Sequence, residues 1–261
     1  MDIIENLTND WQNSGILEND IVLIHSDIRR TLFNYSKKNV IISPGIILES
    51  FIKSVGENGT LIFPTFNFNF STHKTPFSII DTPSEMGVLT EYARKNVHFI
   101  RTKHPVYSFA VYGKHKKIFE AADNKSAYSD DSPFGILKYL NGKIASLNLD
   151  ELSSMTFYHH IEEINRVNYR YFKNFSGDYI DEFGIKSNKT FSIFVRDIQR
   201  GVKTHLNPVG ELLWSEKLYS GYRHNEGTGL RVINAQKMFD FVTKEIINKN
   251  KAEGLLYRIE K

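Results

Sequence analysis

The residues best suited to chemistry lie in the segment 153–169, SSMTFYHHIEEINRVNY. This segment pairs histidines with glutamates at a spacing of three, His159 with Glu162 and His160 with Glu163. Residues three apart lie on one face of a helix. A carboxylate beside an imidazole fixes its tautomer and stabilises its protonated form, as a general base requires. The spacing therefore indicates a base with an orienting acid.

Thr156 precedes His159 by three residues, so the predicted face presents a hydroxyl, a base and an acid. The spacing alone leaves two other interpretations open. A His/Glu pair on a helix is often a surface pair worth roughly 0.2–0.5 kcal/mol. Histidine and glutamate also bind zinc, so a metal-dependent hydrolase using His159, His160 and Glu163 is an alternative, although the sequence holds no HExxH or CxxC motif.

The elements that must position these residues alternate along the chain. Strands are predicted at 20–24, 60–63, 108–112, 143–149, 189–197 and, as the last one, 229–233. Helices are predicted from Ser43-Pro44 to Gly56, from a Thr82/Glu85 capping box towards Lys95, from Ser132-Pro133, over 156–166, and from Asn234 to about residue 250. This interleaving predicts an α/β fold with a central, mainly mixed sheet covered by helices on both faces.

Composition limits the class of protein. The chain has 261 residues, 41% of them hydrophobic, and no linker-like stretch, which predicts a single domain over 1–261. It has no cysteine, so disulfides and a catalytic thiol are excluded. The first residues lack the pattern of a secretory signal, and no apolar run is long enough for a membrane span. We therefore expect a cytoplasmic protein that does not act at a membrane.

The net charge is +3, with lysines and arginines scattered along the chain. No basic stripe with interleaved aromatic residues is present, which argues against a nucleic-acid partner. A mildly basic balance suits an anionic ligand.

Several blocks of the sequence, in order, resemble the aminoglycoside 3-N-acetyltransferase family over about residues 15–245. The segment TFYHHIE resembles the family signature of Thr, two residues, His, two residues and Glu. The accompanying blocks are VLIHSDIRRTLF, GTLIFPTFNF, TPSEMGVLTEYAR, RTKHPVYSFAVYG and DSPFGILKYLNGKI. The resemblance implies the antibiotic N-acetyltransferase fold, which differs from that of the GNAT enzymes, and acetyl transfer from acetyl-CoA, as co-substrate, to an amine, with no metal.

The resemblance also implies roles for the residues of the signature. His159 matches the general base that takes a proton from the acceptor amine, and Glu162 matches its orienting partner. Thr156 would hold the thioester oxygen or the acceptor.

The same resemblance places the cofactor. His25, Ser26, Arg29 and Arg30 match a CoA-contacting loop after the first strand, where a helix N-terminus would suit the pyrophosphate. Ser108, in the HPVYS block, is a candidate contact for the cofactor arm.

Two departures from the family bear on the acceptor. Tyr107 stands where the family often has a second histidine, and the chain is slightly basic although aminoglycosides are polycations. We therefore expect an acceptor that is either an aminoglycoside or, preferably, a less cationic amino sugar, free or nucleotide-linked, of the kind used for surface polysaccharide. A catalytically inactive CoA- or carbohydrate-binding relative is the alternative. The aromatic tail at 255–257 could pack on its own chain or on a second copy in a homo-oligomer.

Overall fold

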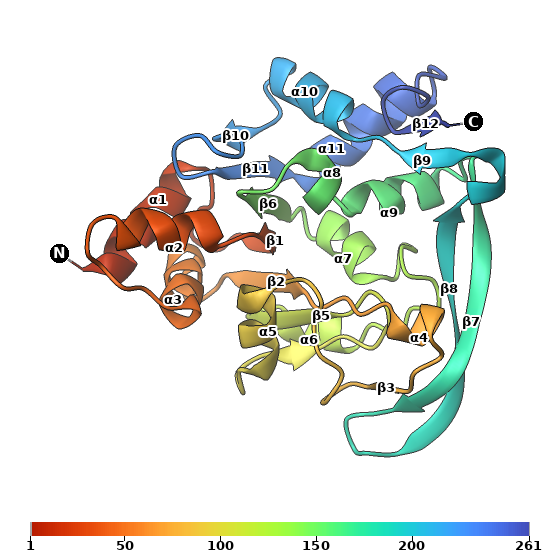
Figure 1. Ribbon diagram of the computed structural model, residues 1–261, viewed down its shortest axis with the longest axis horizontal. Helices are drawn as coiled ribbons and strands as arrows, with labels where there is room; N and C mark the ends of the chain where they lie inside the picture. Colours follow the sequence, from red (N-terminus) through yellow and green to blue (C-terminus); the bar gives the residue numbers. More distant parts are fainter. Residues whose placement is uncertain (1, 261) are drawn as a thin grey trace.

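The computed structural model describes residues 2–260 and has a seven-stranded sheet at its centre (Figure 1). Three neighbouring strands of this sheet run parallel, and the strands that flank them run antiparallel, so the sheet is mixed as predicted. In spatial order the strands are β10 (Ser220–Gly221), β11 (Leu230–Asn234), β6 (Lys143–Leu147), β1 (Ile21–Ser26), β2 (Thr60–Pro64), β5 (Phe109–Gly113) and β4 (Ile100–Arg101).

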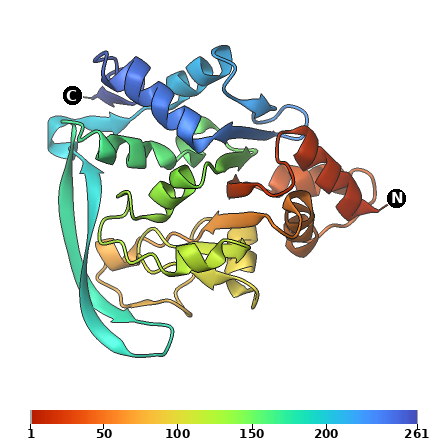
Figure 2. The same cartoon turned by 180° about the vertical axis from the view of Figure 1, so that it is seen from behind.

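Helices cover both faces of the sheet because its central strands bury side chains in both directions. Successive side chains of a strand point to opposite faces. In β1, Val22 and Ile24 enter one hydrophobic cluster, whereas Ile21 and Leu23 enter the other. The first cluster packs against α1 (Ile3–Asn13), α3 (Pro44–Val55) and α5 (Val88–Lys95); the second packs against α7 (Pro133–Tyr139), α9 (Phe157–Ile164), α10 (Asn207–Ser215) and α11 (Ala235–Phe241) (Figures 1 and 2).

Three of the predicted helix starts are confirmed by their caps. The side chains of Ser43, Ser132 and Asn234 accept hydrogen bonds from the backbone N–H groups three residues on. Gly56, with a φ of 66°, ends α3 as predicted. The sequence predicts these caps because in each one a side-chain oxygen accepts from the backbone N–H of a residue only three positions away.

The capping box at Thr82 and Glu85 is wrong. The Thr82 hydroxyl accepts from the backbone of Ser78, and Glu85 contacts Phe68 and Asn69 instead. The helix α5 begins only at Val88, after Gly87 with a φ of 111°. Residues 79–87 are therefore a loop, and tertiary contacts replace the local cap.

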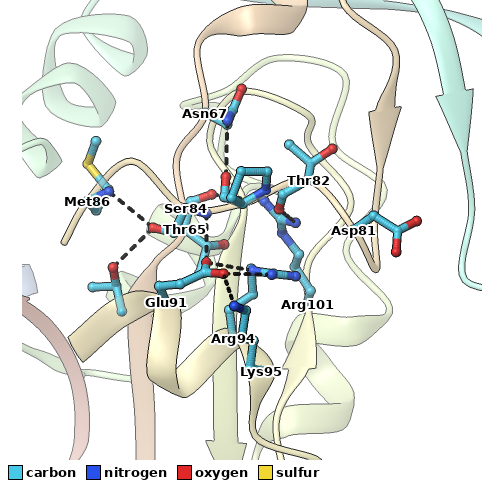
Figure 3. Close-up of polar contacts among 12 residues, drawn as sticks. Thr65, Asn67, Asp81, Thr82, Ser84, Met86, Glu91, Arg94, Lys95 and Arg101 are labelled. Atoms are coloured by element: carbon cyan, nitrogen blue, oxygen red, sulfur yellow. Dashed lines mark hydrogen bonds and ion pairs between the residues drawn. The ribbon is translucent and has the colours of Figure 1, made fainter. Parts of the chain in front are cut away.

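Arg101 holds this loop to the sheet (Figure 3). Its buried guanidinium donates to the carbonyls of Ile79, Thr82 and Thr65 and to the hydroxyl of Ser108. Burial, together with the nearby Arg94, lowers the pKa of Arg101 to about 9, so the group stays charged at neutral pH. Arg101 thus binds three carbonyl oxygens and one hydroxyl oxygen, with no carboxylate partner, and these hydrogen bonds fix the loop in place.

A long antiparallel hairpin, β7 (Arg170–Ile180) and β8 (Lys186–Arg196), lies along one side of the central sheet (Figure 1). With β3 (Phe77–Ser78) it forms a second, three-stranded sheet. The predicted strand at 189–197 is part of β8, whereas β7 was not predicted. Arg170 and Arg196 stand opposite each other at the end of the hairpin nearest α9.

The C-terminal part differs from the prediction in two ways. The helix α11 ends at Phe241 and continues as a π-helical turn, Val242–Ile247. A further strand, β12 (Tyr257–Ile259), pairs with β9 (Val202–Thr204), so 229–233 does not form the last strand. The short elements that complete the chain are α2 (Arg29–Ser36), α4 (Asn69–Thr72), α6 (Lys116–Glu120), α8 (Glu151–Ser154) and the 3-10 turn Ile198–Arg200.

The aromatic tail packs on its own chain. Leu256 is fully buried, and the Tyr257 ring stacks on Tyr169 with the ring centroids 4.0 Å apart. Within residues 2–260, no helix combines the length and the apolar character needed to cross a membrane.

Candidate active site

The helix α9 brings His159 and Glu162 together, as their spacing indicates. The Nδ1 atom of His159 lies 3.0 Å from Oε2 of Glu162. The carboxylate is almost wholly buried, whereas the imidazole side chain keeps 17% of its exposure. Glu162 is therefore the inner residue of the pair and His159 the outer one.

Two residues that the sequence analysis missed complete the support of Glu162. The Nε atom of Arg170 lies 2.7 Å from Oε2 in an ion pair, and the Tyr169 hydroxyl donates to Oε1 at 3.0 Å. Both residues lie beyond the end of α9, at the start of β7, so helical spacing could not reveal them. The Nη2 atom of Arg170 also lies 3.0 Å from Nδ1 of His159.

These charges set the protonation of the pair. Burial lowers the pKa of His159, Arg170 lowers it further, and Glu162 offsets only part of the shift. Burial alone would raise the pKa of Glu162, but Arg170 and His159 outweigh it and hold this pKa below its ordinary value. At neutral pH the pair is thus a carboxylate and a neutral imidazole. In the tautomer with its proton on Nδ1, His159 donates to the ionised carboxylate and its Nε2 lone pair is free to act as a base.

The second His/Glu pair does not form. The Nδ1 atom of His160 lies 2.7 Å from the carbonyl oxygen of Tyr128, and Glu163 accepts from Ser126 at 2.8 Å. Residues 2–260 contain no group of three histidine or acidic side chains that could hold a metal ion. The three residues of the proposed hydrolase site, His159, His160 and Glu163, therefore do not converge.

Thr156 is placed at the start of α9 but not beside the imidazole of His159. Its hydroxyl lies 3.4 Å from Nε2 of His25, the buried histidine near the end of β1. Burial, together with Arg231, lowers the pKa of His25 to about 3, so this imidazole is neutral at neutral pH. Thr156 thus connects α9 to the loop after β1.

A cavity of about 410 Å³ opens where the loop after β1 meets the N-terminus of α5. It is lined by Ser26, Arg29, Met86 and Gly87, among others. The Ser26 hydroxyl is buried and has no hydrogen-bond partner within residues 2–260. A ligand in the cavity could reach this hydroxyl only after a local rearrangement, because the atom itself is buried.

The other residues predicted to bind the cofactor are engaged by the protein. Arg29 is highly exposed and pairs with Asp27, whereas Arg30 donates to Asn148 and to the backbone of Asn225. Ser108 is fully buried; its hydroxyl lies 3.0 Å from both Thr65 and the guanidinium of Arg101.

His159 opens onto a second cavity, of about 440 Å³, between α9 and the β7–β8 hairpin. Tyr107 and Tyr128 form part of its wall, with their ring centroids 4.8 Å apart. The tyrosine that departs from the family pattern thus lies beside the candidate base. The first cavity reaches Ser153, shortly before α9, and the second reaches His159 within that helix.

Comparisons with known proteins bear on the family and the fold. A family model described as aminoglycoside 3-N-acetyltransferase matches residues 23–246. A search of curated proteins found no matching sequence.

Solved structures share the fold at low identity. The chain is 18% identical to the aminoglycoside acetyltransferase AAC(3)-Xa, covering 91% of this chain and 90% of that one, with a TM-score of 0.73. AAC-IIIb, in a binary complex with CoASH, is 17% identical over 94% and 96%, with a TM-score of 0.76. The YokD protein from Bacillus subtilis is 21% identical over 96% and 95%, with a TM-score of 0.73.

The fold and the family match define an acyltransferase. Because the family model covers most of the sequence, the chain belongs to the aminoglycoside 3-N-acetyltransferase family.

Proposed function

We propose that this protein transfers the acetyl group of acetyl-CoA to an amine of a sugar-like acceptor, with His159 as the general base. The observation that carries the proposal is the 3.0 Å contact between His159 and the buried carboxylate of Glu162, beside a cavity onto which the imidazole opens. Family membership supports the reaction type.

The chemistry follows from the protonation states. The amine nitrogen attacks the thioester carbonyl while Nε2 of His159 takes its proton, and a C–N bond forms. The C–S bond then breaks, and the departing sulfur receives the proton from the imidazolium. Glu162 stabilises the positive charge that His159 carries between these steps, and donors near the carbonyl oxygen must stabilise its developing negative charge.

The donor fits the cavity beside the loop after β1. Ser26, whose buried hydroxyl has no partner in the described residues, lines this cavity. His25, in β1, contacts Thr156, which we propose contacts the thioester oxygen or the acceptor. Arg29, whose side chain is 88% exposed, would exchange its ion pair with Asp27 for one with a phosphate. Arg30 and Ser108 act by holding the walls rather than by reaching the ligand. The related AAC-IIIb structure holds CoASH, which supports acetyl-CoA as co-substrate.

The acceptor belongs in the cavity onto which His159 opens, because the amine must reach Nε2. Structures of the related AAC-VIa contain the aminoglycoside sisomicin. For this chain we propose an amino sugar, free or nucleotide-linked, in addition to the aminoglycosides.

The proposal is tested by thiol release from acetyl-CoA with a panel of amines, comparing the wild type with His159→Ala. We expect loss of a general base to lower kcat about 10²- to 10⁴-fold while CoA binding is retained. His98→Ala, which replaces an exposed histidine between α5 and β4 that does not line the cavity, is the matched control. Full activity of His159→Ala would overturn the mechanism. Binding of CoA without thiol release from any amine would indicate an inactive relative.

A further inference from the structure

The cavity onto which His159 opens is positively charged. Arg170, Lys173 and Arg196 line it, and no aspartate or glutamate is among its lining residues in the part of the chain that the structure describes. A polycationic acceptor needs carboxylates near its ammonium groups. The wall of this cavity offers the opposite charge.

Two of the three cations have no counter-ion from the protein. Arg170 is neutralised by Glu162 at 2.7 Å. Over residues 2–260, neither Lys173 nor Arg196 takes part in an ion pair, and the Lys173 ammonium only approaches the ring of Phe175. Asp197, next to Arg196, uses its carboxylate to cap the following turn. About two positive charges are therefore left for a ligand.

The hairpin places these charges where a ligand beside His159 would meet them. Arg196 stands directly opposite Arg170 in the β7–β8 register, so the two side chains share one face of the hairpin. The charge of Arg196 reaches His159, whose pKa it helps to lower after burial and Arg170. Lys173 shares a face of β7 with Tyr171 and Phe175, and all three line the cavity. Lys173 and Arg196 therefore lie on different faces of the hairpin, and each leaves an unpaired positive charge at the border of the cavity.

We propose that the acceptor is an amino sugar that carries an anionic group, a phosphate or a carboxylate, which is attracted by Lys173 and Arg196 at the border of the cavity while its amine faces His159. This inference rests on the proposed function. The aromatic wall of Tyr107, Tyr128 and Tyr171 packs against the sugar ring, and the two cations select the charged substituent. A polycationic aminoglycoside is disfavoured in the same place.

The test compares acceptors that differ only in charge, at saturating acetyl-CoA. The panel is a free amino sugar, its 1-phosphate, its nucleoside-diphosphate ester, the matching aminouronic acid and an aminoglycoside. We expect kcat/KM to be at least tenfold higher for an anionic acceptor than for the free sugar, and lower still for the aminoglycoside. The preferred member of the panel tells a phosphate from a carboxylate. Salt should weaken the preference because it screens the charges.

Variants assign the preference to these residues. In the double variant Lys173→Gln with Arg196→Gln, the ratio of kcat/KM between the anionic and the free sugar should fall at least tenfold. Lys186→Gln, at the exposed start of β8 and outside the cavity, is the matched control and should leave the ratio within twofold of the wild type. A wild-type ratio near one, or a ratio unchanged in the double variant, overturns the inference. The inference is also overturned if the double variant raises KM for acetyl-CoA and leaves kcat/KM for the acceptors unchanged, because the two cations would then bind the acyl donor.

Direct binding separates this inference from the proposed function. Calorimetric titration of the wild type with the amino-sugar 1-phosphate needs no turnover. Binding that is lost in the double variant, in a protein that releases no thiol with any amine, would support the anionic site and overturn the transferase proposal. Thiol release that depends on His159 but shows no charge preference would do the reverse.

Discussion

Tyr257, four residues before the last residue of the chain, stacks on Tyr169, and the hydroxyl of Tyr169 donates to the carboxylate that contacts His159. A strand at the end of the chain therefore supports the candidate base through two intermediates. The stack also explains why residues 255–257 pack on their own chain.

Loss of this stack should weaken the site without removing any group from it. In Tyr257→Ala, we expect the free energy of unfolding to fall by about 1–2 kcal/mol, because an aromatic pair contributes about 0.5–1.5 kcal/mol beyond its buried area. A several-fold loss of kcat should accompany this change because Tyr169 is less well held. Urea unfolding and steady-state assays measure the two effects, and Tyr139→Ala, an exposed tyrosine at the end of α7, is the control.

Tyr169→Phe removes one hydrogen bond from Glu162 and keeps the ring. We expect a loss of about 1–3 kcal/mol in the free energy of unfolding, since a buried carboxylate oxygen is left without its donor. The stack on Tyr257 should survive, so the double variant with Tyr257→Ala separates the two contributions. Stability equal to that of the wild type would show that the hydroxyl does not support Glu162.

Glu162→Gln should cost both stability and activity. The substitution leaves the buried Arg170 without its counter-ion, which we expect to lower the free energy of unfolding by about 3 kcal/mol. Because Glu162 has a lowered pKa, its contribution is present above the ordinary glutamate pKa and is lost as pH falls through the folded value. The difference in stability between variant and wild type should therefore be full at pH 7 and shrink at about pH 4 and below. A difference independent of pH would contradict this account.

The pH dependence of kcat/KM tests the protonation of His159 directly. A general base works when it is neutral, so the rate should rise with pH through the pKa of His159 and then level off. Since burial and Arg170 lower this pKa, the inflection should lie below 6.5. In Glu162→Gln it should move lower still, because the carboxylate raises the value. An inflection above 6.5 would show that another group limits the rate.

Three other buried histidines should make the fold sensitive to acid. Burial lowers the pKa to about 3 for His25, about 3 for His104 and about 4 for His160, so the unfolded chain binds their protons below about pH 6.5 and the folded chain does not. Each then lowers stability by about 1.4 kcal/mol per pH unit below that point. The raised pKa values of Glu151 and Glu163 act in the opposite direction.

Urea unfolding between pH 7 and 5 measures the difference. We expect the free energy of unfolding to fall as the pH falls, with a slope that corresponds to the uptake of at least about one proton on unfolding. His104→Gln should reduce this uptake by about one proton. Constant stability over this range would contradict the assignment.

Local patterns in the sequence predicted the parts of the fold that local contacts determine. The Ser43, Ser132 and Asn234 caps and the pairing of His159 with Glu162 each involve residues three apart, and the structure contains all four. The same reasoning failed for Thr82 and Glu85, because Arg101 binds their loop from a distant strand.

Part of the candidate site was not predicted for the same reason, namely that it depends on contacts between distant segments. Arg170 and Tyr169 meet Glu162 only because the chain turns from α9 into β7. Tyr257 joins them from the far end of the chain. Contacts of this kind are set by how the elements pack, and no spacing in the sequence indicates them.

Helix α9 and the β7–β8 hairpin contribute different parts of the candidate site. The candidate base and its acid belong to one helix, whereas the hairpin contributes Tyr171, Lys173 and Arg196 to the wall of the cavity proposed for the acceptor. Substitutions along the hairpin can therefore change which amines are accepted while the inherited chemical step is left intact. Relatives that keep this helix but carry other charged residues on the hairpin would be expected to catalyse the same reaction on different substrates.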